Sequence, residues 1–240
     1  MVLVWETAFV KRYNQYCPIV RASEIVAERW MPVVLRNILL GCRTFTQIAR
    51  GAPGISRTLL VQRLKELERF GIIERVPNPA GRGFLYEPTR AGLEFWDVCE
   101  ALGTWGARWL EVAPEHLDPY VVLWSMCNSL DRDRLPSERV VVRFDFPDRP
   151  RPNRFWLLFE RGSGEVCVKH PGIDEDLYVT ADSEAFASWH MGREPWSRMV
   201  GSGRIRLEGP RALVRAFPTW NRLSHFAGVQ PLVGAIAASR

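Results

Sequence analysis

The sequence has little that would hold a metal ion or a disulfide framework. Its five cysteines are scattered without a C-x-x-C pair, and its four histidines are isolated from one another and from cysteine. Zinc sites need ligands at short spacings, and disulfide frameworks need an even set of cysteines. We therefore predict no metal site and no cofactor.

Long apolar runs are also missing. The best candidate is interrupted by Glu28, Arg29 and Arg36, so it falls short of the ~20 apolar residues that cross a bilayer. The N-terminus lacks the apolar core of a signal peptide. The sequence thus predicts no membrane association, and the cytoplasm is the expected location.

Patterns of catalytic residues are absent as well. The GSG tripeptides at 162–164 and 201–203 lack the strand-to-helix setting of a nucleotide-binding loop or a nucleophile elbow. No Ser/His/Asp set or carboxylate pair stands out. We expect the protein not to be an enzyme.

Charge is distributed unevenly along the 240 residues. The net charge is +5, and the whole excess falls in residues 1–110, which carry 15 basic against 10 acidic side chains, whereas residues 111–240 carry 17 of each. No acidic residue lies between Glu28 and Glu66, an interval that holds seven basic ones. Such a polarised segment favours contact with a polyanion.

Helical spacing followed by a hairpin pattern marks the N-terminal half. Apolar spacing predicts a first helix over 23–40, in which Pro32 marks a bend or a break, and a short helix over 45–50. After the GAPG turn at 51–54, a longer helix over 56–70 is capped by Ser56 and ended by Gly71. Strands over 72–76 and 84–87 flank a Pro/Gly-rich loop, and a last helix covers 90–110.

The helix over 56–70 has two distinct faces. One is a stripe of three leucines at helical spacing, which we expect to be buried. The other, called the polar row below, presents hydrogen-bonding side chains in steps of four, three and four residues. The polar row consists of Thr58, Gln62, Lys65 and Arg69.

This order of elements is that of a winged helix-turn-helix. The polar row of its longer helix is then placed to enter the major groove, and the hairpin tip to lie along the backbone or to put Arg82 in the minor groove. Gln62 is suited to paired bonds with adenine, and Arg57 or Arg63 to guanine or phosphate. The predicted DNA-binding residues are Arg43, Thr46, Gln47, Ser56, Arg57, Thr58, Gln62, Arg63, Lys65 and Arg82.

Residues 17 to about 110 resemble the HxlR-type winged-helix transcriptional regulators of bacteria. The motifs that carry the resemblance are a cysteine at position 17, the RW pair at 29–30, F-x-x-I-x-R at 45–50, GIS-x-x-L-L-x-x-RLKELE-x-x-G at 54–71 and Y-x-x-T-x-x-G at 86–92. The resemblance implies a homodimer on a two-fold operator, with helices that flank the winged core supplying the dimer contact.

The second half predicts an α+β domain. Helices are expected over 116–130, 183–190, 196–200 and 211–220, and strands over 140–146, 155–159, 166–168, 177–179 and 205–207. Residues 177–221 resemble the sterol-carrier-protein family through D-S-x-x-F at 182–186 and G-x-G-x-x-x-L-x-G at 201–209. That resemblance implies a pocket for an apolar or lipid-like molecule. The competing interpretation is that most of the aromatic residues are simply core. The aromatic residues expected to line the pocket are Trp156, Phe159, Phe186, Trp189, Trp196 and Phe217.

Cys17 offers a different kind of control. Some HxlR-type regulators use the cysteine at this place as a sensor of oxidants and electrophiles, and Arg12 and Arg21 would favour a thiolate if they lie close in space. A buried, inert cysteine is the competing interpretation.

Together these patterns predict an α+β protein of two domains, 1–112 for DNA binding and dimerisation and 113–240 for an effector. We expect a homodimeric, sequence-specific transcriptional regulator, a repressor that binds an inverted repeat in double-stranded DNA. The alternatives are a thiol-based redox regulator acting through Cys17, and a lipid-binding or carrier module whose helix-turn-helix serves only dimerisation.

Overall fold

The computed structural model describes residues 13–160 and 162–232. The chain divides into two compact units between Ala101 and Leu102, inside helix α6 (Trp96–Trp109). The sequence predicts a boundary at residue 112, which lies just after the C-terminal end of α6.

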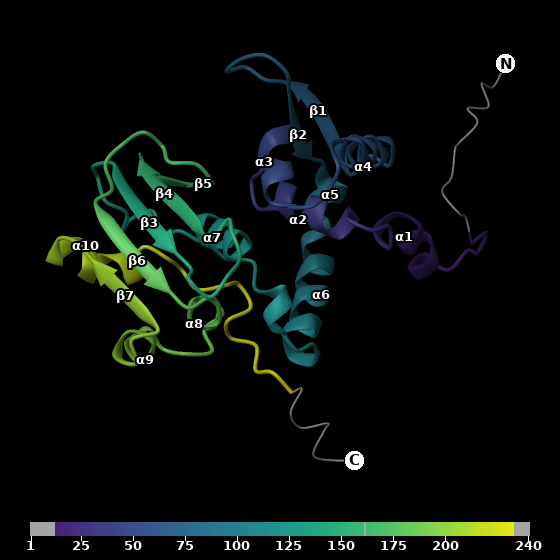
Figure 1. Ribbon diagram of the computed structural model, residues 1–240. Coiled ribbons are helices and arrows are strands. Elements are labelled where there is room, and N and C mark those ends of the chain that lie inside the picture. Colours follow the sequence, from purple (N-terminus) through teal and green to yellow (C-terminus); the bar gives the residue numbers. More distant parts are fainter. Residues whose placement is uncertain (1–12, 161, 233–240) are drawn as a thin grey trace. The chain divides into compact units, whose positions relative to one another are not determined.

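The N-terminal unit has the element order of a winged helix (Figure 1). Helices α1 (Pro18–Val26), α2 (Met31–Leu39), α3 (Phe45–Arg50) and α4 (Arg57–Arg69) precede the antiparallel strands β1 (Ile73–Pro77) and β2 (Phe84–Pro88), and α5 (Arg90–Glu94) leads into α6. The core contains one face of α2 and the predicted leucine stripe of α4. Its buried side chains include Met31, Val34, Leu35, Ile38, Ile48, Leu60, Leu64 and Leu67.

Two helices expected from the sequence are each divided into two. The expected helix over 23–40 breaks at Trp30, which takes a left-handed conformation with φ of 75° and so turns the chain between α1 and α2. Pro32 lies in the first turn of α2, where the missing N–H of proline costs no hydrogen bond. The expected helix over 90–110 divides at Phe95 into α5 and α6.

Side-chain caps fix where the short helices of this unit begin. The Thr44 hydroxyl accepts from the Gln47 N–H, and the Gln47 side chain accepts in return from the Thr44 N–H, which is a complete capping box for α3. Ser56 caps α4 by accepting from the Leu59 N–H at 3.2 Å. The ends of the two helices are therefore set locally.

The C-terminal unit is an α+β domain around one five-stranded sheet. Its strand order is β5 (Ser163–Cys167), β4 (Arg154–Glu160), β3 (Val140–Asp145), β6 (Leu177–Ala181) and β7 (Ile205–Glu208), with only β3 and β6 parallel. The remaining elements are η1 (Pro114–His116), α7 (Pro119–Cys127), α8 (Ser183–His190), α9 (Trp196–Gly201), α10 (Arg211–Ala216) and η2 (Phe217–Thr219). The expected helices over 116–130 and 211–220 are thus shorter than their apolar patterns suggested.

Helices cover one face of this sheet. Phe144 on β3 contacts Phe186 of α8 edge-on at 5.5 Å and Phe217 of η2 at 5.9 Å between ring centroids. Phe159 on β4 contacts Trp220, just after η2, at 5.2 Å. Aromatic rings therefore form the core between the sheet and its helices.

The C-terminal segment of this unit packs against α6. The Leu232 N–H donates to the Arg108 carbonyl at 2.7 Å. The Phe226 ring lies so close to Gly103 that a Cβ at that position would be 2.1 Å from its Cζ atom. This glycine therefore allows the ring to lie directly on the helix backbone.

His190 is buried among polar side chains of the same unit. Its Nε2 lies 3.0 Å from the Ser125 Oγ, and its Nδ1 lies 3.3 Å from the Asn221 Nδ2. Burial lowers the pKa of His190 to about 4. The folded protein consequently keeps this imidazole neutral at pH 7.

We expect the stability of this unit to fall between pH 6.5 and pH 4. Because the folded pKa lies below the ordinary value, the unfolded chain binds the proton more readily in this window, and the contribution present above pH 6.5 is lost as pH falls. The full effect is about 3 kcal/mol. Urea unfolding at pH 7 and pH 4.5 should show it, and His190→Gln should flatten the dependence; equal pH slopes for both proteins would contradict it.

Candidate nucleic-acid interface

The turn between α3 and α4 sets where the polar row begins. Gly54 has φ of 89°, a conformation that side-chain-bearing residues rarely adopt, and a Cβ there would lie 3.8 Å from the Trp30 indole. The Ile55 N–H donates to the Ala52 carbonyl at 3.1 Å. A backbone hydrogen bond therefore closes the turn. The turn lies next to Trp30, the residue at which the chain divides into α1 and α2.

Most residues predicted to face DNA are exposed. They belong to the start of α3, the N-terminal cap and first three turns of α4, and the hairpin tip. The exposed members are Thr46, Gln47, Ser56, Arg57, Thr58, Gln62, Lys65 and Arg82, whereas Arg43 is half-buried and Arg63 is buried.

Arg57 is held at the junction of α3 and α4. Its guanidinium carbon lies 4.8 Å from the centroid of the Phe45 ring, within the range of a cation–π contact. This contact restricts the side chain, and the residue is still exposed. The sequence did not reveal that Phe45 supports Arg57, because there Phe45 appears only as an apolar residue of α3.

Arg63 does not belong to the exposed face, which corrects its prediction as a DNA contact. Its Nη2 lies 2.8 Å from a Glu28 oxygen, its Nη1 lies 2.7 Å from a Glu66 oxygen, and its Nε donates to the Arg29 carbonyl at 3.0 Å. With only 8% of its side chain exposed, this arginine joins α4 to the α1–α2 connection. We remove it from the DNA-facing set.

Arg43, Gln47 and Ser56 also have partners within the protein. The Arg43 guanidinium lies 2.7 Å from Glu87 of β2 and donates to the Ile38 carbonyl, so it joins the end of α2 to the wing. Gln47 accepts through its Oε1 in the α3 cap, and the Ser56 Oγ caps α4. The structure therefore shows support roles for these residues, and a DNA contact by any of them stays a prediction.

The wing is a narrow hairpin with an exposed tip. Strands β1 and β2 pair from Ile73 with Pro88 to Pro77 with Phe84, and the Asn78 N–H donates to the Gly83 carbonyl at 3.1 Å. The loop that joins the two strands (Figure 1) contains Arg82, which is exposed. Arg75 covers the Phe84 ring at 4.3 Å, a cation–π contact that stiffens the base of the tip.

An exposed apolar surface runs along one face of α6. Four side chains at spacings of four, three and four residues form what we call the α6 stripe, and each is between 36% and 56% exposed. Apolar groups aligned on one face of a helix are typical of a helix that packs on a partner. The α6 stripe consists of Val98, Leu102, Trp105 and Trp109.

Cys17 lies at the N-terminal cap position of α1 and is partly exposed. Arg21, one of the two arginines expected to favour a thiolate, forms an ion pair with Glu24, so its charge is compensated. The other, Arg12, lies outside the described residues. A redox role for Cys17 stays a prediction.

Five of the six aromatic residues predicted to bind an effector share one interior. Trp189 lies 5.3 Å from Phe186, 4.5 Å from Trp196 and 6.4 Å from Phe217, measured between ring centroids. Phe159 joins them through Trp220. Trp196 is the only partly exposed member of these five; we call them the aromatic group.

Trp156 lies on the other face of the sheet, which corrects its place in that predicted set. It lies three residues before Phe159 on β4, and side chains of a strand alternate between faces. Its Nε1 donates to Glu175 at 3.0 Å, and its ring meets His170 at 5.4 Å. Trp156 therefore cannot line a cavity with the aromatic group.

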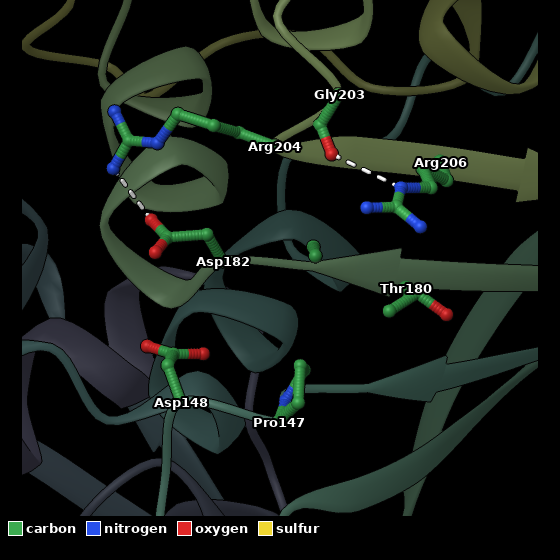
Figure 2. Close-up of a pocket in the computed structure, with 8 residues that line it drawn as sticks. Pro147, Asp148, Thr180, Asp182, Gly203, Arg204 and Arg206 are labelled. Atoms are coloured by element: carbon green, nitrogen blue, oxygen red, sulfur yellow. Dashed lines mark hydrogen bonds and ion pairs between the residues drawn. The ribbon is translucent and has the colours of Figure 1, made fainter.

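A separate hollow of about 290 Å³ opens at one end of strands β6 and β7 (Figure 2). Arg204 lies 2.6 Å from Asp182 across it, and Arg206 donates to the Gly203 carbonyl. None of the residues predicted to hold the apolar effector lines this hollow. Its lining includes the charged side chains of Asp148, Asp182, Arg204 and Arg206.

Within residues 13–160 and 162–232, no group of three or more His, Cys, Asp or Glu side chains could hold a metal ion. In the same part of the chain, no helix is long and apolar enough to cross a membrane.

Comparison with known proteins places similarity mainly on the winged-helix part. A family model described as HxlR-like helix-turn-helix matches residues 25–114. The helix-turn-helix transcriptional regulator MT3179 of Mycobacterium tuberculosis is 33% identical over 115 residues, covering 42% of this chain and 72% of its own length.

Two solved structures are similar to parts of the chain. PA1607, named as a transcription factor, is 24% identical with a TM-score of 0.39, covering 42% of this chain and 70% of its own. The sec-alkylsulfatase Pisa1 from Pseudomonas sp. is 16% identical with a TM-score of 0.37, covering 46% of this chain and 17% of its own.

Proposed function

Because this chain belongs to the HxlR-like helix-turn-helix family of transcriptional regulators, we propose that it binds specific sites in double-stranded DNA. Helix α4 enters the major groove with its polar row forward, and the β1–β2 wing lies along the neighbouring backbone. The single observation that carries this proposal is the exposed set Arg57, Thr58, Gln62 and Lys65, on a helix whose opposite face is buried.

The protein acts as a homodimer on an inverted repeat. The α6 stripe supports this, since a monomer would leave two tryptophans partly exposed on one helix face. Two copies related by a two-fold axis would present two α4 helices to two half-sites. We propose repression as the mode of action, because a bound dimer covers its operator, and the cytoplasm as the location, because DNA is reached there.

Control by a small apolar or lipid-like effector is the proposed role of the C-terminal unit. The aromatic group supports it, with Trp196 as the partly exposed member through which a ligand would enter. We also propose that this unit is a sterol-carrier-like domain and that the protein has no enzymatic activity.

Capture of sheared genomic DNA by the full-length protein tests the main proposal. We expect enrichment of a few fragments that share an inverted repeat. On such a fragment, Arg57→Ala should weaken binding about 10-fold and reduce the slope of log affinity against log salt by about one, because one phosphate contact is lost. Stability to thermal unfolding should fall by no more than about 1 kcal/mol, which is the value of an exposed cation–π contact such as the one with Phe45.

Arg90→Ala provides the matched control, since Arg90 is 93% exposed on α5 and paired only with Glu94 in the described residues. It should bind DNA like the unaltered protein. Uniform or absent retention of genomic DNA would contradict sequence-specific binding and favour a lipid-binding module, whose apolar affinity would barely change with salt.

A further inference from the structure

The side chain of Gln62 makes a hydrogen bond within the protein on the exposed face of α4. Its Nε2 donates to the Glu66 Oε1 at 3.1 Å, one helical turn further along. A glutamine amide has a donor edge and an acceptor edge that nearly superpose on half-rotation, so a freely rotating glutamine can present either edge to a base. A hydrogen-bond partner that can bind only one of the two edges would fix which edge of the amide faces the base.

Glu66 is such a partner, because an ionised carboxylate only accepts hydrogen bonds. Only the Nε2 edge of Gln62 can face it, so the Oε1 edge must face away. One N–H of Gln62 is used in this bond, and the second N–H and the Oε1 stay available. Those two groups are what adenine requires, which donates from N6 and accepts at N7 in the major groove.

Glu66 is itself held from behind. Its other oxygen, Oε2, lies 2.7 Å from the Arg63 Nη1, and Arg63 in turn lies 2.8 Å from Glu28. The side chain of Glu66 is 15% exposed and that of Arg63 only 8%. The two carboxylate oxygens of Glu66 thus have different partners. Oε2 contacts the buried Arg63, and Oε1 accepts from Gln62 on the proposed DNA-facing side.

We propose that Glu66, fixed by Arg63, is a positioning residue that sets the orientation of the Gln62 amide and thereby restricts one position of each half-site to adenine. This inference rests on the proposed function, because it assigns a role within the same DNA interface. Glu66 touches no base. Its contribution is to specificity, and it contributes little to sequence-independent affinity.

Selection from random duplexes by the full-length protein is the test. The unaltered protein should enrich adenine at one position of each half-site, and Gln62→Ala should lose that preference. Glu66→Gln should reduce the preference about 10-fold, because a glutamine at 66 can offer either edge to Gln62, while binding of unrelated duplex should change no more than it does in Glu68→Gln. Glu68→Gln, which removes the same charge from an exposed site on the same helix, should keep the preference.

Altered bases provide a second readout that needs no protein variant. With an enriched site in hand, replacing the adenine by 7-deazaadenine removes the N7 acceptor, and replacing it by purine removes the N6 donor. Each should weaken binding of the unaltered protein about 10-fold, and neither should add to the loss in Gln62→Ala. This readout holds even if Glu66→Gln does not fold.

The outcomes separate this inference from the function on which it rests. If the unaltered protein enriches no shared motif, specific DNA binding itself fails. If it enriches a motif but folded Glu66→Gln keeps the base preference that Gln62→Ala loses, the positioning role of Glu66 is wrong. Indifference of the unaltered protein to both altered bases would overturn the assignment as well.

Discussion

Replacing Trp105 with glutamate is expected to convert the proposed dimer into monomers and to weaken binding to the proposed operator by about 100-fold or more. Trp105 is 56% exposed at the middle of the α6 stripe. Two half-sites bound by one dimer benefit from a high effective concentration of the second α4 helix, and separate monomers lose that benefit. A carboxylate within an apolar contact would also be desolvated without a partner.

Sedimentation equilibrium, together with operator titration, would measure both parts of this expectation. Val168→Glu is the matched control, because Val168 is an equally exposed apolar residue just after β5 and is not part of the α6 stripe. It should stay dimeric with unchanged affinity. A Trp105→Glu protein that is still dimeric would show that the α6 stripe is not the contact between copies.

Substituting alanine for Gly92 is expected to destabilise the winged-helix unit by about 3 kcal/mol or more. A Cβ at this position would be 2.1 Å from the Ile72 carbonyl oxygen, which is backbone and cannot rotate away. The same oxygen accepts from the N–H and the hydroxyl of Thr89, at 3.0 and 3.1 Å. Movement of α5 to relieve the clash would therefore break the cap that starts this helix.

Urea unfolding would measure the loss, with Gly106→Ala as the comparison. Gly106 lies within α6, and a Cβ there meets only the Leu110 side chain at 3.9 Å, so alanine should be neutral or stabilise by about 0.5–1 kcal/mol. Equal stability of Gly92→Ala and the unaltered protein would mean that the approach of α5 to Ile72 is looser than the structure shows.

The order of elements in the winged helix could be predicted because its signals are local. The leucine stripe of α4, the Ser56 cap and the Pro/Gly-rich wing loop each act within a few residues, and each is confirmed by the structure. The sequence also indicated a bend or break at Pro32, but not that the break falls at Trp30. Periodicity does not mark a tryptophan that takes a left-handed conformation, and the indole of Trp30 lies near Gly54, far away along the chain.

The candidate site was predictable in outline and not in its partners. The sequence placed Arg63 in a basic segment, but Glu28, which pairs with it, lies far away along the chain. The bond between Gln62 and Glu66 has the four-residue spacing of facing helix side chains, so this signal was present in the sequence. The opposite faces of Trp156 and Phe159 also followed from their spacing on a strand.

The packing of Phe226 on Gly103 restricts how these two positions can change during evolution. Glycine weakens a helix interior, so drift toward alanine at 103 would ordinarily be favoured. Here an added methyl group would enter the ring of a residue far away along the chain. Substitutions at the two positions should therefore covary among chains of this architecture, with a larger residue at 103 only where residue 226 has become small.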